Sequence, residues 1–207
     1  IAQRMLELRE DGASLNEMAV LYRSHYQSME IQMELTKRGI PFEIRSGIRF
    51  FEEAHIKDVL AYLKILHNPR DEISWSRILR LINKVGPRTA DKIFQHINQN
   101  EKPVLALCAE DTLALVPPVA ERDFKRFQGL VASLLEKSSP AEMIKAVSES
   151  NYVEHLKTEY PNYQERLEDL VQLGSYATQF KDLEELLSAL ALVSGLEAEK
   201  IVDGGEK

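Results

Sequence analysis

The sequence predicts a mainly α-helical chain, in which a short α/β segment is followed by an all-helical domain. Residues 18–22 form an unbroken apolar run, which is typical of a strand covered on both faces of a parallel sheet. Helical periodicity, by contrast, dominates from Gly47 to about Val193. We therefore expect three parts: an α/β segment over 1–52, a helical domain over 53–195 and a connecting segment over 196–207.

The α/β segment is expected to alternate helix and strand. A first helix occupies residues 1–11 and ends at Gly12, and the apolar strand 18–22 follows. A second helix over 26–38 ends at Gly39, and a second short strand is expected at 42–45. This order is that of a strand-helix-strand unit.

The helical domain opens with a strongly amphipathic helix after Gly47. Its apolar stripe at helical spacing consists of Ile56, Val59, Leu60, Leu63 and Leu66. The polar side chains of Lys57, Asp58 and Lys64 lie off the stripe, so we expect them on the exposed face.

Capping signals mark later helices. Ser139, Pro140 and Glu142 have the spacing of a capping box with proline at the first helical position. Asp182 suits the cap of the last helix, and the pair Pro117–Pro118 breaks the chain between two others.

Charge is unevenly distributed along the 207 residues, which carry a formal net charge of -7. Residues 77–100 hold five basic side chains against one acidic, whereas residues 161–207 hold four basic against ten acidic. The middle of the chain therefore suits an anionic partner, although the chain as a whole is acidic.

Composition is that of an ordinary soluble protein. Cys108 is the only cysteine, which excludes an internal disulfide or a cysteine-based zinc site and favours an intracellular, cytoplasmic address. The longest apolar run is far shorter than the roughly 20 residues that span a bilayer, so no membrane partner is expected. The chain opens with Ile1 and has no signal segment, and we expect it to be an excised fragment.

Motifs for independent catalysis are missing from the sequence. It contains no glycine-rich phosphate loop followed by Lys and Ser or Thr, no serine elbow and no paired metal-ligand spacing. The five histidines are scattered and are expected to be surface or packing residues. We therefore predict no catalytic, cofactor-binding or metal-binding residue in this chain.

The clearest binding signal is a turn between two helices, with Val85, Gly86 and Pro87 at its centre, which has the pattern of a helix-hairpin-helix motif. Gly86 permits a close backbone approach, and Pro87 suits the first helical position. The free amides of a new helix favour an anion such as a DNA phosphate.

Basic side chains surround this turn. Lys84, Arg88 and Lys92 add positive charge and Thr89 adds a hydroxyl, so contacts to phosphate without base recognition are the natural expectation. The turn alone is equally compatible with a plain helix connection whose basic face is solvated.

Several motifs in order resemble one helicase family. They are AVLYRS at 19–24, GIPF at 39–42, GIRFF at 47–51, IKD at 56–58 and RLEDL at 166–170. With the turn at 84–89, they make nearly the whole chain resemble the UvrD/Rep/PcrA-type superfamily 1 DNA helicases.

The resemblance implies a parent enzyme that couples ATP hydrolysis to 3′-to-5′ translocation and strand separation in DNA repair or replication. Such enzymes have two RecA-like motor domains with helical insertions. The chain would be part of the second motor domain, 2A, followed by most of its insertion, 2B. ATP and Mg would then be cofactors of the full-length parent, bound outside this chain. The implied partners are a single-strand/duplex DNA junction and repair or transcription proteins.

The resemblance also implies site residues. Arg23 and Arg49 fall where the family has basic residues along the single-strand track, and His25 falls where asparagine is common. A salt bridge at a strand end is the alternative for both arginines. In the duplex hairpin, the implied contacts come from Lys84, Val85, Gly86, Arg88, Thr89 and Lys92.

Departures from the family pattern qualify these assignments. Pro87 removes one amide from the hairpin, and Ser46 replaces a glycine of the motif before Arg49. Phe50 and Phe51 are expected to be core anchors rather than platforms for base stacking.

Two other interpretations remain open. The acidic stretch 165–199 suits a protein-docking or autoinhibitory helical module with little DNA binding of its own. A related ATP-driven nuclease-helicase would share the same motifs.

Overall fold

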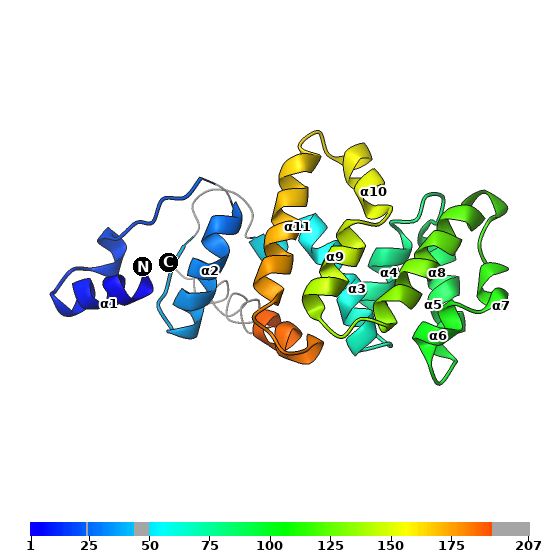
Figure 1. Ribbon diagram of the computed structural model, residues 1–207, viewed down its shortest axis with the longest axis horizontal. Coiled ribbons are helices and arrows are strands. Elements are labelled where there is room, and N and C mark those ends of the chain that lie inside the picture. The colour runs from blue at the N-terminus through cyan, green and yellow to red at the C-terminus, as the bar shows by residue number, and fades with distance from the viewer. Residues whose placement is uncertain (24, 44–49, 192–207) are drawn as a thin grey trace, which may run out of the picture. The chain divides into compact units, whose positions relative to one another are not determined.

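The computed structural model describes residues 1–23, 25–43 and 50–191, and every regular element within these ranges is a helix (Figure 1). The chain divides into two compact units. The first comprises Ile1–Glu53 with the chain from Ala189 onward, and the second comprises Ala54–Ser188. We call them the N-terminal unit and the helical unit.

Four short elements form the N-terminal unit: α1 (Ala2–Glu10), η1 (Leu15–Glu17), α2 (His25–Lys37) and η2 (Phe50–Glu52). Both predicted helices are confirmed, and a left-handed glycine follows each: Gly12 at φ 100° and Gly39 at φ 63°. The unit has a small core in which Ala2, Leu35 and Ile40 are buried.

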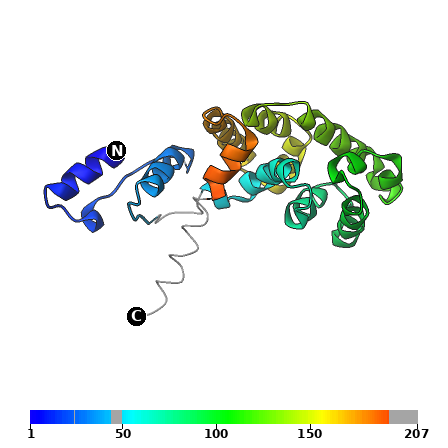
Figure 2. The same cartoon turned by 90° about the horizontal axis from the view of Figure 1, so that it is seen from below.

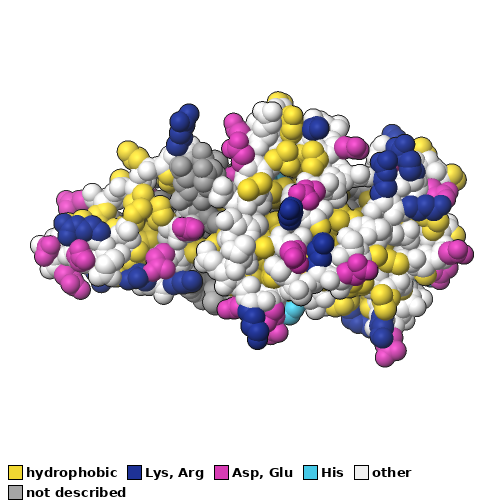
Figure 3. Space-filling model, in the orientation of Figure 1, with side chains coloured by type: hydrophobic (Ala, Val, Ile, Leu, Met, Phe, Trp, Pro, Cys, Tyr) yellow, Lys and Arg dark blue, Asp and Glu magenta, His cyan; other side chains and the backbone are white. Residues whose placement is uncertain are grey.

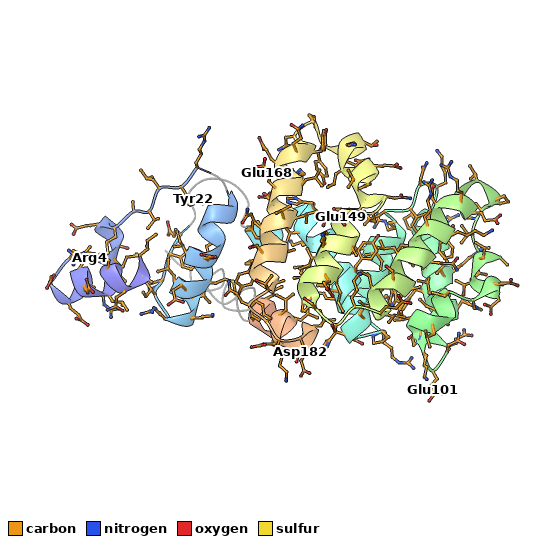
Figure 4. All side chains as sticks on the ribbon, viewed as in Figure 1. Arg4, Tyr22, Glu101, Glu149, Glu168 and Asp182 are labelled. Carbon is orange, nitrogen blue, oxygen red and sulfur yellow. The ribbon has the colours of Figure 1, made fainter. Side chains whose placement is uncertain are left out.

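The predicted strand at 18–22 is wrong. This segment has no regular structure and connects η1 to α2; Tyr22 marks it in Figure 4. Leu21 is 95% exposed, which is the opposite of a strand covered on both faces. A strand needs neighbours to pair its backbone, and two short strands do not form a stable sheet by themselves.

The second predicted strand, 42–45, does not form over its described part, because residues 42 and 43 are irregular. Its remainder, together with Ser46, Gly47 and Arg49, lies outside the described residues. Phe50 is 1% exposed and meets Phe51 edge to face with 5.2 Å between ring centroids, which confirms Phe50 as a core residue.

The helical unit begins with α3 and contains the remaining helices. They are α3 (Ala54–His67), α4 (Glu72–Leu79), α5 (Pro87–Asn98), α6 (Pro103–Leu107), α7 (Glu110–Leu113), η3 (Pro118–Ala120), α8 (Glu121–Leu135), α9 (Pro140–Ser148), α10 (Tyr152–Glu159) and α11 (Tyr163–Ala177). A further helix begins at residue 183.

Helix α3 lies at the centre of this unit and packs against α4, α9 and α11, while α9 and α11 run side by side (Figures 1 and 2). The predicted stripe of α3 is buried except at Leu66, which is half-buried. Asp58, expected on the exposed face, is only 5% exposed, and His55 is completely buried. Because helices cover α3 on several sides, these two side chains have partners inside the protein, whereas Lys57 and Lys64 are exposed as expected.

The capping predictions have mixed outcomes. Helix α9 begins at Pro140 as expected, but the Ser139 side chain makes no capping hydrogen bond. At the last helix, the Glu185 amide donates to the Asp182 carboxylate over 3.0 Å, so that cap is confirmed.

Candidate nucleic-acid interface

The turn between α4 and α5, residues 80–86, is fixed by apolar anchors on both sides. Helix α5 presents a buried stripe of Ala90, Ile93, Phe94 and Ile97. Within the turn, Ile82 and Val85 are 7% and 5% exposed. The Val85 side chain therefore secures the turn to the core and faces away from solvent.

The start of α5 has amides available for an anion. Gly86 is the N-cap and supplies no capping side chain, and Pro87 occupies the first helical position. Within the described residues, the Gly86 and Arg88 amides have no hydrogen-bond acceptor. The helix dipole adds partial positive charge at the same end.

Lys84, not Gly86, holds the unusual backbone conformation in this turn. Lys84 has φ 65°, whereas Gly86 has φ -87° and ψ 175°, which any residue adopts. A Cβ atom on Gly86 would meet nothing within 4 Å, so the space outside this backbone is open. An incoming group can approach Gly86 closely.

Four basic side chains surround the turn and the first half of α5. Arg80, Lys84, Arg88 and Lys92 are all exposed. None of the four side chains has a hydrogen bond or ion pair with another part of the chain that the structure describes. Arg88 and Lys92 are one helical turn apart, and the half-buried Thr89 lies beside Arg88.

An open cleft of about 850 Å³ lies next to this turn, between residues 80–85, helix α8 and helix α10. Basic side chains reach it from two elements: Arg80 and Lys84 from the turn, and Arg122 and Arg126 from α8. Figure 3 shows Lys and Arg side chains gathered at this end of the helical unit, near α8. The acidic residues that line it are Asp123 on α8 and Glu154 and Glu159 on α10.

Neutral aromatic residues line the inner part of the cleft. The rings of Tyr62 and Phe127 lie 5.9 Å apart, and Tyr152 is 4% exposed. Burial raises the pKa of Tyr62 and of Tyr152 well above the ordinary value of 10.0, and the charge of Asp58 raises both further. Both phenols therefore stay protonated near neutral pH.

A buried carboxylate connects the aromatic lining of the cleft to α3 and α4. Asp58 accepts hydrogen bonds from Arg77 Nη1 at 2.7 Å and from the Tyr152 hydroxyl at 2.8 Å. These contacts tie α4 and α10 to the central helix.

A second polar cluster joins α3 to α11. Arg166 Nη1 donates to His55 Nδ1 at 2.7 Å, and His55 Nε2 therefore donates to Asp169 at 3.1 Å. The Arg166 guanidinium also lies over the Tyr160 ring, 3.9 Å from its centroid. His55 is thus a packing histidine, as predicted.

The predicted single-strand residues are only partly described. Arg23 is exposed in a bend just before α2. The backbone of His25 begins α2, while its side chain and Arg49 lie outside the described residues. The assignment of these three residues to the single strand therefore stays a prediction.

Other kinds of site find little support in the described residues. No group of three or more His, Cys, Asp or Glu side chains there could hold a metal ion. Burial raises the pKa of the Cys108 thiol, which disfavours the reactive thiolate. No described helix is both long and apolar enough to cross a membrane.

Comparison with known proteins decides the family. Residues 1–201 match the model of the UvrD-like helicase C-terminal domain. The chain belongs to this family. It is 29% identical over 191 residues to the ATP-dependent DNA helicase PcrA of Staphylococcus aureus, covering 89% of this chain and 26% of that protein. It is also 29% identical over 195 residues to DNA helicase II of Escherichia coli, covering 89% of this chain and 27% of that protein.

The chain spans about a quarter of the length of these helicases. A third relative, PcrA of Staphylococcus epidermidis, is 27% identical over 212 residues, covering 95% of this chain and 29% of that protein. The family membership therefore supports a helicase C-terminal region.

The sequence did not single out the residues on the far side of the cleft. Arg122 and Arg126 are four residues apart on α8, and Phe124 and Phe127 are buried on the same helix. That spacing could have predicted an exposed arginine pair. It could not have predicted that the pair faces the turn about 40 residues earlier in the chain, because that depends on tertiary packing.

Proposed function

We propose that this chain is a DNA-binding segment of an ATP-dependent 3′–5′ DNA helicase, and that it contributes duplex contacts and regulation of unwinding. The observation that carries the proposal is a set of exposed cations beside the first amides of α5, none of which has a partner among the described residues, in a chain of the helicase family. Phosphate groups are the ligands that this combination recognises.

In this proposal the 80–86 turn binds one strand of the duplex through its backbone phosphates. Lys84, Arg88 and Lys92 supply mobile charge, and Thr89 supplies a hydroxyl. The amides of Gly86 and Arg88 donate directly to phosphate oxygens, because no Cβ atom obstructs the approach at Gly86. Val85 contributes only its backbone, since its side chain is buried.

We also propose that Arg23, His25 and Arg49 contact the single strand in the complete enzyme. The N-terminal unit would then be part of motor domain 2A and the helical unit most of insertion 2B. Repair or transcription proteins are further proposed partners, and the cytoplasm is the proposed location. These assignments rest on the family and on the motifs around the three residues.

The residues present do not fit an ATP or Mg site. The sequence has no glycine-rich phosphate loop, and no described cluster of carboxylates could hold the metal. We therefore expect ATP and Mg to bind elsewhere in the full-length parent, and the chain alone to hydrolyse no ATP.

The test is a fluorescence-anisotropy titration of this chain with a duplex that carries a 3′ single-stranded tail, repeated at several salt concentrations. The variant Lys84→Gln/Arg88→Gln should lower affinity about tenfold at low salt and flatten the plot of log affinity against log salt by about two units. Binding should be independent of base sequence, because only phosphates are contacted.

The matched control is Lys145→Gln/Lys157→Gln, which removes two cations from α9 and α10 outside the turn and the cleft. It should bind like the unmodified chain. Equal affinities for the turn variant and the control would refute the DNA role of the turn, and would leave protein docking as the better proposal.

A further inference from the structure

We propose that the cleft beside the 80–86 turn is a second phosphate-binding surface, in which Arg122 and Arg126 of α8 hold the same DNA strand that the turn binds. The inference rests on the proposed function and extends it to an element that no motif indicated. Its basis is the geometry of the cleft, where these arginines and the turn line one continuous space.

Continuity with the turn favours DNA as the occupant. Lys84 belongs to the turn and also lines the cleft, and Arg80 lines the cleft from the same segment. A strand whose phosphates lie on the turn therefore passes directly toward α8. With Arg122 and Arg126 included, the cations of this surface come from two elements far apart in the sequence.

Asp123 regulates this surface in the absence of DNA. Its carboxylate lies 3.3 Å from Arg122 Nε and 3.8 Å from Arg126 Nη1, so one acid holds both arginines. The two arginine side chains are 78% and 48% exposed, so these ion pairs are weak and hydrated. A DNA strand presents several phosphates in a row, each a charged acceptor for an arginine, so it can displace the single carboxylate.

The acidic side of the cleft determines where the strand lies. Glu154 and Glu159 line it from α10, opposite in charge to the arginines of α8. Repulsion keeps a polyanion on the side of α8 and the turn, away from α10. The proposed strand therefore follows one wall of the cleft and does not fill it.

The first experiment repeats the salt-dependent anisotropy titration with Arg122→Gln/Arg126→Gln. Affinity for the tailed duplex should fall about tenfold at low salt, and the salt dependence should flatten by between one and two units. The pair Arg122→Lys/Arg126→Lys should restore most of the binding, because it restores the charge. The control Lys125→Gln/Lys145→Gln removes one cation from α8 and one from α9, neither of which lines the cleft.

The second experiment looks for a gain in DNA affinity, which an unfolded variant cannot produce. Asp123→Asn releases both arginines and should tighten binding about threefold at low salt. Glu121→Gln is the matched control, because it removes an acid from the same helical turn but outside the cleft. It should leave the affinity unchanged.

The outcomes separate this inference from the proposed function. Suppose that Lys84→Gln/Arg88→Gln lowers the affinity for the duplex but Arg122→Gln/Arg126→Gln binds like the control. This result overturns the α8 surface alone. No loss with either variant overturns both. If poly-glutamate of equal charge displaces the duplex as well as competing DNA does, the cleft binds acidic peptides and the inference is wrong.

Discussion

The N-terminal unit and the helical unit differ in how their backbone groups and buried polar side chains find hydrogen-bond partners. In the helical unit, the backbone bonds lie within each helix, and the buried Asp58 and His55 both have partners. In the N-terminal unit, residues 19–22 make no backbone hydrogen bond within the described chain, and Leu21 is 95% exposed. A helix completes its own hydrogen bonds, whereas a strand depends on a neighbour.

Native-state hydrogen exchange should show this contrast most strongly. Amides in the middle of α3 should exchange at least about a thousandfold more slowly than those of residues 19–22, since α3 opens only with the whole unit. Mass spectrometry of peptic peptides measures both in one sample. Strong protection at 19–22 would show that this segment pairs as a strand in solution. The two units would then not differ in their backbone hydrogen bonding.

Local rules predicted the helix ends and failed wherever a distant partner decides. Gly12, Gly39 and Pro87 mark boundaries through their own backbone preferences, and all three boundaries are confirmed. The burial of Asp58 depends on Tyr152, which is 94 residues away, and that of His55 depends on Asp169, which is 114 residues away. No local pattern contains those contacts.

In the candidate site, too, local patterns predicted some features, while others depend on residues distant in the sequence. The exposure of Arg88 and Lys92 was predictable, because the apolar stripe of α5 places them on its outer face. The side of the cleft formed by α8 was not, since it depends on how the helices pack.

Removing the buried carboxylate should have a clear effect on the stability of the helical unit. Asp58→Asn loses the ion pair with Arg77 and weakens the bond from Tyr152, and we expect it to lower the free energy of unfolding by about 2 kcal/mol. Arg77 is 38% exposed and can be rehydrated, which limits the cost.

Urea unfolding followed by the fluorescence of Trp75 measures this effect, because Trp75 is the only tryptophan and is buried in the helical unit. Asp91→Asn on the exposed face of α5 is the control and should change the free energy by less than about 0.5 kcal/mol. If Asp58→Asn also changes the free energy of unfolding by so little, the stability of the helical unit does not depend on this interior contact.

The smallest expected effect concerns residues with a left-handed backbone conformation. The type of residue in this conformation differs between the two units. Among the described residues, the left-handed positions of the N-terminal unit are Gly12 and Gly39, whereas the helical unit has Lys84 at φ 65°. This conformation costs a residue with a side chain roughly 1–2 kcal/mol, and part of the gain from glycine is lost to its greater freedom when unfolded. Lys84→Gly should therefore raise the free energy of unfolding by about 0.5 kcal/mol in the Trp75 assay and weaken DNA binding by loss of one cation. In the reciprocal variant, Gly39→Ala, the end of α2 before Gly39 should be destabilised by about 1 kcal/mol. If Lys84→Gly lowers stability instead, contacts of the Lys84 side chain outweigh the backbone strain of the turn.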